Sequence, residues 1–171
     1  MTTIPQNNKT SWIKNIIIIV FVLIFIGIFA LAGLITDFYW FDALGFANIF
    51  TISLSTKILT FAVAAVSFFI FLFINLAISS KINTLKKQKE VLSLKFKSLI
   101  ALVISIFVGF TATSAWFTIL KYLNRTSFNI ADPIFAKDVS FYVFTLPFYS
   151  AIWTFVFATV FVTLILVILD Y

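Results

Sequence analysis

The chain has 171 residues, of which 63% are apolar and 11% charged, and its mean hydropathy is +1.16. Soluble domains are typically about 45–50% apolar and about 25% charged. A chain of this size has too little interior to hide so much Phe, Ile, Leu and Val from water. The composition therefore excludes a soluble globular protein and predicts a membrane protein.

Cysteine and histidine are both absent from the sequence. Their absence removes thiolate nucleophiles, disulfides, Cys or His metal sites and the usual general base near neutral pH. The net charge of +6 would suggest nucleic acid in a soluble protein, but no aromatic side chains alternate with the lysines as a base-stacking groove requires. We therefore expect no enzyme activity, no cofactor or metal and no nucleic-acid partner.

Charged residues divide the chain into four charge-free windows, which are 15–36, 58–80, 98–120 and 139–169. Each of the first three makes a helix of roughly 33 Å, enough to cross a hydrocarbon core of about 30 Å. The fourth window is longer, and Pro147 is expected to divide it and to leave 148–169 as the span. A single strand cannot satisfy its backbone in lipid, so helices are required. The predicted fold is all-α and polytopic, with four transmembrane helices and short interfacial helices in the outer loops.

The lysines predict the orientation of these spans, because Lys and Arg concentrate on the cytoplasmic side. The tail 1–14 and the connection 81–97 hold eight of them, which are Lys9, Lys14, Lys81, Lys86, Lys87, Lys89, Lys95 and Lys97. We expect both regions in the cytoplasm, the aromatic loop 37–57 and the loop 121–147 outside, and the C-terminal residues 170–171 inside. This describes a multi-pass plasma-membrane protein. The six lysines of 81–97 are candidate contacts for anionic lipid, or they act only as topology determinants.

The N-terminus allows a second interpretation. Lys14, the apolar run 16–29 and Ala30-Leu31-Ala32 resemble the basic region, core and cleavage site of a signal peptide. The apolar stretch continues through Leu34 and Ile35 and is as long as a span, which favours a retained helix. Cleavage would leave three spans with unchanged orientations.

The third span carries a packing pattern of small side chains at every fourth position, which are Ala101, Ser105, Gly109 and Thr113. Such a face lets another helix approach closely, so we expect it to contact a neighbouring span. The hydroxyls of Thr111 and Ser114 are expected to bond to backbone or to a neighbouring helix rather than to line a water path. The sequence places no ionisable residue in the interior of a span, which argues against a proton-coupled transporter built from this chain alone.

The outer loops carry the remaining signals. Gly45 is expected to allow a turn between an aromatic cluster at 38–41 and a second stretch at 47–56. Asp132-Pro133 is typical of a helix start, and Asp138 is expected to cap a second short helix that ends at Leu146-Pro147. That helix would lie along the outer interface, although the length of 139–146 also allows a re-entrant segment.

Both outer loops contain motifs that resemble a known family. The residues that carry the resemblance are Trp40, Phe41, Leu44, Gly45, Phe46, Ile49 and Phe50, and then Asp132, Pro133, Ile134, Phe135, Lys137, Asp138, Ser140, Phe141, Tyr142, Phe144, Leu146, Pro147 and Phe148. They resemble the N-terminal membrane region of uncharacterised protein family zero-one-eight-two, which comprises large integral membrane proteins of bacteria and archaea. Phe46 stands where the family usually has a tyrosine, and Ala136 where it usually has a glycine.

The resemblance implies further spans and a large extracytoplasmic region, with no established molecular function. Because this chain ends at Asp170-Tyr171, we expect an N-terminal fragment or a truncated member. The sequence favours a membrane anchor or scaffold for a larger envelope protein. The alternative is a subunit of an oligomeric channel or transporter. The expected partners are the lipid bilayer, a second copy of the chain, or the remainder of a larger membrane protein.

Overall fold

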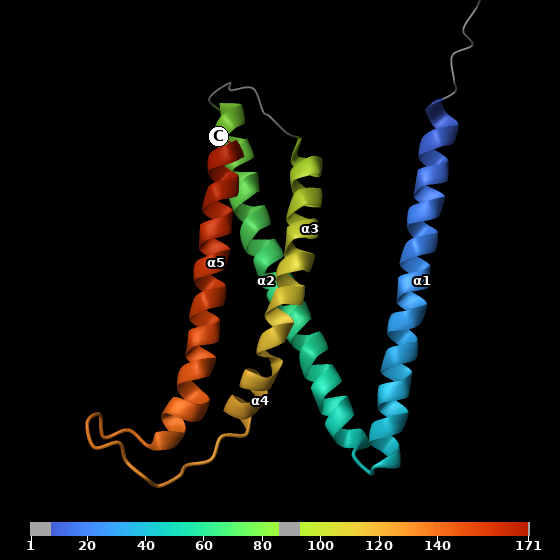
Figure 1. The fold of residues 1–171 in the computed structure, drawn as a ribbon. Helices are drawn as coiled ribbons and strands as arrows, with labels where there is room; N and C mark the ends of the chain where they lie inside the picture. Colours follow the sequence, from blue (N-terminus) through green and yellow to red (C-terminus); the bar gives the residue numbers. More distant parts are fainter. Residues whose placement is uncertain (1–7, 86–92, 171) are drawn as a thin grey trace, which may run out of the picture. The chain divides into compact units, whose positions relative to one another are not determined.

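The computed structural model describes residues 8–85 and 93–170, and side chains within 12–83 and 93–170. The elements are α1 (Asn8–Ala43), α2 (Ala47–Leu85), α3 (Leu94–Ala112), η1 (Thr113–Ala115), α4 (Trp116–Leu123), η2 (Phe141–Thr145) and α5 (Leu146–Asp170). Four helical segments are long and apolar enough to cross a membrane, which are Trp12–Ala43, Ala47–Asn83, Leu94–Leu123 and Phe141–Asp170. Over these described ranges the only β pairing is one isolated bridge. The all-α prediction is confirmed (Figure 1).

The chain forms two compact units, 1–52 and 53–171. In the first, α1 ends in a Schellman turn: the Phe46 N–H donates to the Phe41 carbonyl at 2.8 Å and the Gly45 N–H to the Asp42 carbonyl at 2.9 Å. Gly45 has φ +76°, which a glycine adopts without strain. The expected loop 37–57 is therefore reduced to the turn 44–46. Charge at Asp37, Asp42 and Lys57 does not end a helix, whereas the backbone at Gly45 does.

In the second unit, α2, α3 and α5 pack on one another around a small apolar core. Phe68, Leu72 and Leu76 of α2 and Ala101 of α3 are buried in it. Residues of α5 complete the core from the other side, namely Phe155, Val162, Leu166 and Val167. Figure 1 shows the three helices side by side towards the end at which α5 finishes. We call these three helices the bundle.

The small-residue face of α3 lies against α2. Ala101, Ser105 and Gly109 are all buried. A Cβ added at Gly109 would lie 2.9 Å from the Phe61 ring and 3.0 Å from the Ala65 Cβ, so the glycine permits the close approach. Thr113, the last member of the pattern, is half-buried and begins η1.

The hydroxyls near this face bond to their own helix. Thr111 Oγ1 donates to the Val108 carbonyl at 2.8 Å, and Ser114 Oγ donates to the Thr111 carbonyl at the same distance. Both bonds agree with the expectation that these side chains serve the backbone.

Pro147 does not divide the fourth window as we expected. The helix begins at Val139, passes through the π-helical turn η2 and continues as α5 to Asp170. The Leu146 N–H donates to the Phe141 carbonyl, five residues back. A wider turn immediately before a proline relieves the clash of its ring with the preceding carbonyl, so the helix can continue. The predicted interfacial helix is consequently the first part of the fourth long helix.

Candidate functional site: a buried ion pair between helices

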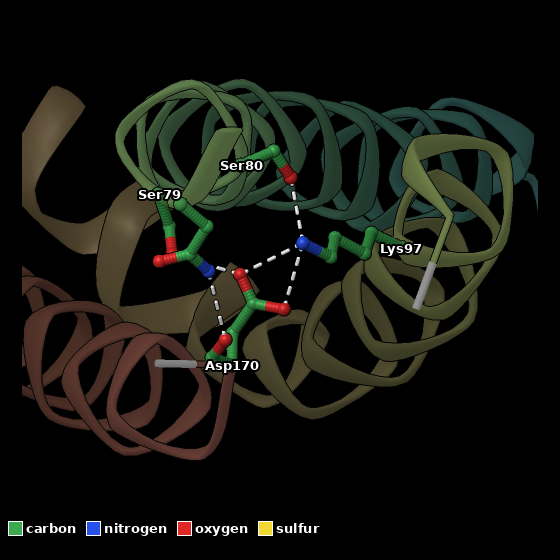
Figure 2. A network of polar contacts seen from close by, with 5 residues as sticks. Ser79, Ser80, Lys97 and Asp170 are labelled. Carbon is green, nitrogen blue, oxygen red and sulfur yellow. Dashed lines mark hydrogen bonds and ion pairs between the residues drawn. The ribbon is translucent and has the colours of Figure 1, made fainter. Parts of the chain in front are cut away.

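A buried ion pair joins α3 to α5 at the end of the bundle where α5 finishes and α3 begins. Lys97 Nζ lies 2.7 Å from Asp170 Oδ1 and 2.8 Å from Asp170 Oδ2. Figure 2 shows the ammonium group pointing between the two carboxylate oxygens. The Lys97 side chain is 2% exposed and that of Asp170 is 5% exposed, so both charges are removed from water.

Helix α2 supplies the neutral partners of this pair, from Ser79, Ser80 and Asn83 on one face of its last turns. Lys97 Nζ donates to Ser80 Oγ at 2.6 Å (Figure 2). Ser79 Oγ donates to Asp170 Oδ2 at 2.8 Å, and Asn83 Nδ2 donates to the Asp170 backbone carbonyl at 3.1 Å. Each helix of the bundle therefore contributes at least one group to a single polar cluster, which we call the ionic cluster.

The bonding of the ionic cluster matches the chemistry of its two charges. An ammonium group has three donors, and a buried charge is tolerated only when it is paired and hydrogen-bonded. Lys97 reaches both oxygens of one carboxylate and a hydroxyl, while Asp170 accepts from a lysine and a serine. Among the side chains that the structure describes, Asn83 Oδ1 and Thr163 Oγ1 are buried without a hydrogen-bond partner.

The ionic cluster corrects the placement of two residues. We placed Lys97 in the basic loop, as a candidate lipid contact, and Asp170 at the chain end, both outside the spans. Both residues instead lie at the ends of membrane-length helices and are buried. A signal was present in the sequence: Lys97 precedes Ala101 by four residues and so extends the small-residue face by one turn.

The other lysines of the basic loop differ from Lys97. Lys81 and Lys95 are exposed. Lys86, Lys87 and Lys89, which we also predicted as lipid contacts, lie outside the described residues.

The loop between α4 and η2 is organised by Asp138, one of the motif residues. Its Oδ2 accepts from Ser127 Oγ at 2.6 Å and from the Asn129 N–H at 2.9 Å. Its Oδ1 accepts from the Ser140 N–H at 2.7 Å and from the Phe128 N–H at 3.2 Å. The hydrogen bond from Ser127, with those from Ser140 and Phe128, holds the pKa of the Asp138 carboxyl well below its usual range. Asp138 thus caps the start of the fourth long helix, as its position predicted.

Asp132 makes a turn where we expected the start of a helix. Its Oδ1 accepts from the Ile134 N–H at 2.9 Å and from the Phe135 N–H at 2.8 Å. The turn closes with the Ala136 N–H donating to the Asp132 carbonyl, and Ala136 then has φ +52°. A left-handed residue ends the turn before a helix can form. Glycine, the residue usual in the family at this position, adopts that conformation without strain.

Aromatic contacts place most of the other motif residues. Phe144 packs edge-on against Phe128, and the Phe148 ring stacks on Tyr122 with centroids 3.9 Å apart. Lys137 Nζ lies 5.7 Å from the centre of the Phe141 ring, whose edge meets Tyr142. In the first unit, Phe41 contacts both Trp40 and Phe50 beside the turn at Gly45. The family motif therefore builds the two connections, whereas the ionic cluster lies outside it.

These features describe a multi-helix membrane protein with its own packed bundle. The chain belongs to the uncharacterised protein family UPF0182, whose profile matches residues 14–171.

Relatives of the family come from distant organisms. The chain is 34% identical to a UPF0182 protein of Trichodesmium erythraeum over 93% of its own length and 19% of the relative's. It is 31% identical to a UPF0182 protein of Methanospirillum hungatei over 81% of the chain and 15% of the relative. It is 35% identical to one of Pelotomaculum thermopropionicum over 71% of the chain and 16% of the relative. The chain thus spans less than a fifth of the length of these relatives. No solved structure matches it.

Proposed function

We propose that this chain is the membrane anchor and scaffold of a larger envelope protein. The ionic cluster carries the proposal, because it ties three long apolar helices together at one end with a charge pair and hydroxyl groups. Polar side chains in helices of this kind act as interhelical links. The length of the relatives supports a larger protein, and the apolar helices support membrane insertion.

The proposal includes an orientation. The exposed lysines Lys81 and Lys95 flank the ionic cluster, which favours the cytoplasmic side for this end of the bundle and the outer side for the loop 124–140. Lys81 and Lys95 are then positioned to meet anionic headgroups of the inner leaflet of the plasma membrane. Lys97 is not part of this contact, since its three donors are engaged inside the bundle.

Single-cysteine labelling tests the orientation directly, because the native chain has no cysteine to remove. Thr126→Cys and Lys95→Cys are both exposed positions, at opposite ends of the bundle. In intact bacterial cells, a membrane-impermeant maleimide should label Thr126→Cys and should label Lys95→Cys only after permeabilisation. The reverse pattern would invert the proposed topology, and full labelling of both positions in intact cells would contradict membrane crossing.

A channel or transporter subunit is the second candidate, and a specific observation favours it. Charged residues within membrane-length helices often mark ion or proton pathways, and the bundle buries the charges of Lys97 and Asp170. Two further buried polar atoms in its described residues have no hydrogen-bond partner, namely Asn83 Oδ1 on α2 and, about two turns along α5 from Asp170, Thr163 Oγ1. Ion flux through liposomes that contain the purified chain separates the two candidates. The anchor predicts flux equal to that of empty liposomes. Flux that depends on the chain and disappears in Asp170→Asn would overturn the anchor in favour of a pathway.

A further inference from the structure

The turn 132–136 exposes two large apolar side chains at its tip. Ile134 is 80% exposed and Phe135 is 68% exposed, and Ile130 on the approach to the turn is 62% exposed. Apolar side chains gathered at the end of a connection usually mark a contact surface. We call Ile134 and Phe135 the apolar tip.

The backbone holds the apolar tip rigidly. Asp132 accepts hydrogen bonds from the N–H groups of both tip residues. Below the turn, the Asp132 N–H donates to the Lys137 carbonyl at 2.7 Å and the Val139 N–H donates to the Ile130 carbonyl at 2.9 Å. Because these backbone groups bond within the loop, the tip offers apolar side chains to its surroundings and not a free hydrogen-bonding edge. A surface preorganised in this way loses little entropy when it is covered.

The surroundings of the loop identify what covers the tip. Both ends of the loop continue into membrane-length helices, at Leu123 and Phe141. Figure 1 shows the loop passing a short way beyond the ends of α4 and α5 and then running out to the side of α5. A loop with this course keeps its tip close to the level at which the two helices end.

Cations lie beside aromatic rings at the same end of the bundle. Lys121 Nζ is 4.5 Å from the centre of the Phe117 ring, Arg125 Cζ is 4.3 Å from that of Tyr122, and Lys57 Nζ is 4.8 Å from that of Trp116. Aromatic rings concentrate at the headgroup level of a bilayer, where Lys and Arg meet lipid phosphates. A mixture of exposed aliphatic and aromatic residues with flanking cations is the composition of a segment that lies in the membrane interface.

From these observations we infer that the apolar tip, Ile134 and Phe135, inserts into the interfacial layer of the bilayer at the end of the bundle opposite the ionic cluster. The partner is the lipid itself, with acyl chains around the tip and phosphates near Lys121, Arg125 and Lys137. The inference needs the helices to cross the bilayer, as the proposed function does, but it does not need the anchor role.

The test uses cysteine variants of the full chain, each labelled with the environment-sensitive fluorophore NBD and reconstituted in vesicles of phosphatidylcholine and phosphatidylglycerol. Ile134→Cys reports the tip. Thr126→Cys is the matched control, because it is an exposed polar position in the same loop. Phe107→Cys, which is exposed along α3, reports the membrane interior. Lipids that carry a nitroxide near the headgroup quench probes in the interface, lipids that carry one deep in the acyl chain quench probes in the membrane interior, and iodide quenches probes in water.

We expect nitroxide lipid to quench the probe at Ile134 at least about twofold more than the probe at Thr126, with a blue-shifted emission, while iodide shows the opposite order. Adding Phe135→Ser to the Ile134→Cys variant should lower the quenching of the probe by nitroxide lipid towards the value measured at Thr126. Equal quenching at Ile134 and Thr126, with a lipid-quenched probe at Phe107, would overturn the inference alone. A water-exposed probe at Phe107 would instead contradict membrane crossing and with it the proposed function.

Discussion

The two ends of the bundle are held together in different ways. At the ionic cluster, partners lie far apart in sequence, as in Lys97 with Asp170 and Ser79 with Asp170. At the loop end, Asp132 and Asp138 bond to groups within eleven positions of themselves. A carboxylate that is satisfied locally shapes a connection, whereas one that is satisfied across helices fixes the positions of the helices. The same residue type thus has a tertiary role at one end and a turn-forming role at the other.

The largest expected effect is at the ionic cluster. Lys97→Met keeps the length of the side chain but leaves Asp170 charged, buried and without its cation, which typically costs about 3–5 kcal/mol. We expect a large fall in the thermal unfolding temperature of the chain in detergent. Lys95→Met is the matched control, because Lys95 is exposed two residues earlier. Equal unfolding temperatures for the two variants would show that the buried pair contributes nothing particular.

A second large effect is expected at Gly109, further along the same face of α3. Gly109→Leu puts a side chain where even a Cβ would lie 2.9 Å from Phe61, so α2 and α3 must separate. Overpacking of this kind typically costs about 1–3 kcal/mol or more. Gly33→Leu is the control, since no atom lies within 4 Å of a Cβ added there. Thermal unfolding in detergent and the oligomer size on a sizing column should change for Gly109→Leu only.

A smaller and local effect is expected at Asp138. Because hydrogen bonding lowers the pKa of its carboxyl, the loop gains stability that is present above the usual carboxyl pKa of about 3.9 and is lost as the pH falls through the lowered value. The loop should therefore stay ordered when the pH is lowered to 4. The rates of hydrogen exchange at the Phe128, Asn129 and Ser140 amides report whether the loop stays ordered at that pH. In Asp138→Asn these amides should exchange faster at neutral pH, while the core of the bundle keeps its protection.

The smallest effect is expected at Thr111. Its hydroxyl donates to the Val108 carbonyl of its own helix and its side chain is exposed, so Thr111→Val should change the thermal unfolding temperature by the equivalent of about 0.5 kcal/mol or less. A marked loss of stability would mean that the hydroxyl serves a neighbouring helix. As a control, a substitution of Ser105, whose side chain is buried on α3, should lower the thermal unfolding temperature by more than Thr111→Val does.

Local rules in the sequence predicted much of this fold. Long charge-free windows indicated the four helices, Gly45 indicated the turn after α1, and four-residue spacing indicated the buried face of α3. These signals need only the geometry of one helix or one turn. The prediction at Pro147 was wrong because the π-helical turn before the proline removes the clash of its ring with the preceding turn of the helix. No single residue in the sequence predicts such a turn.

The ionic cluster was missed for a different reason. In a sequence, Lys97 is one lysine of a basic loop and Asp170 is a charge at the end of a window. Only the packing of α3 and α5 on α2 brings them together, and sequence spacing contains no information about partners 73 positions apart. The continuation of the small-residue face through Lys97 marked the lysine as buried, but it did not identify the carboxylate.

The most direct test of the account is a double-mutant cycle between Lys97 and Asp170, read as thermal stability of the chain in detergent. The cluster predicts that Lys97→Met and Asp170→Asn are each strongly destabilising, and that the double variant is more stable than the sum of the two losses, because it no longer buries an unpaired charge. Strictly additive losses would contradict a direct link between α3 and α5, and with it the bundle on which the anchor proposal depends.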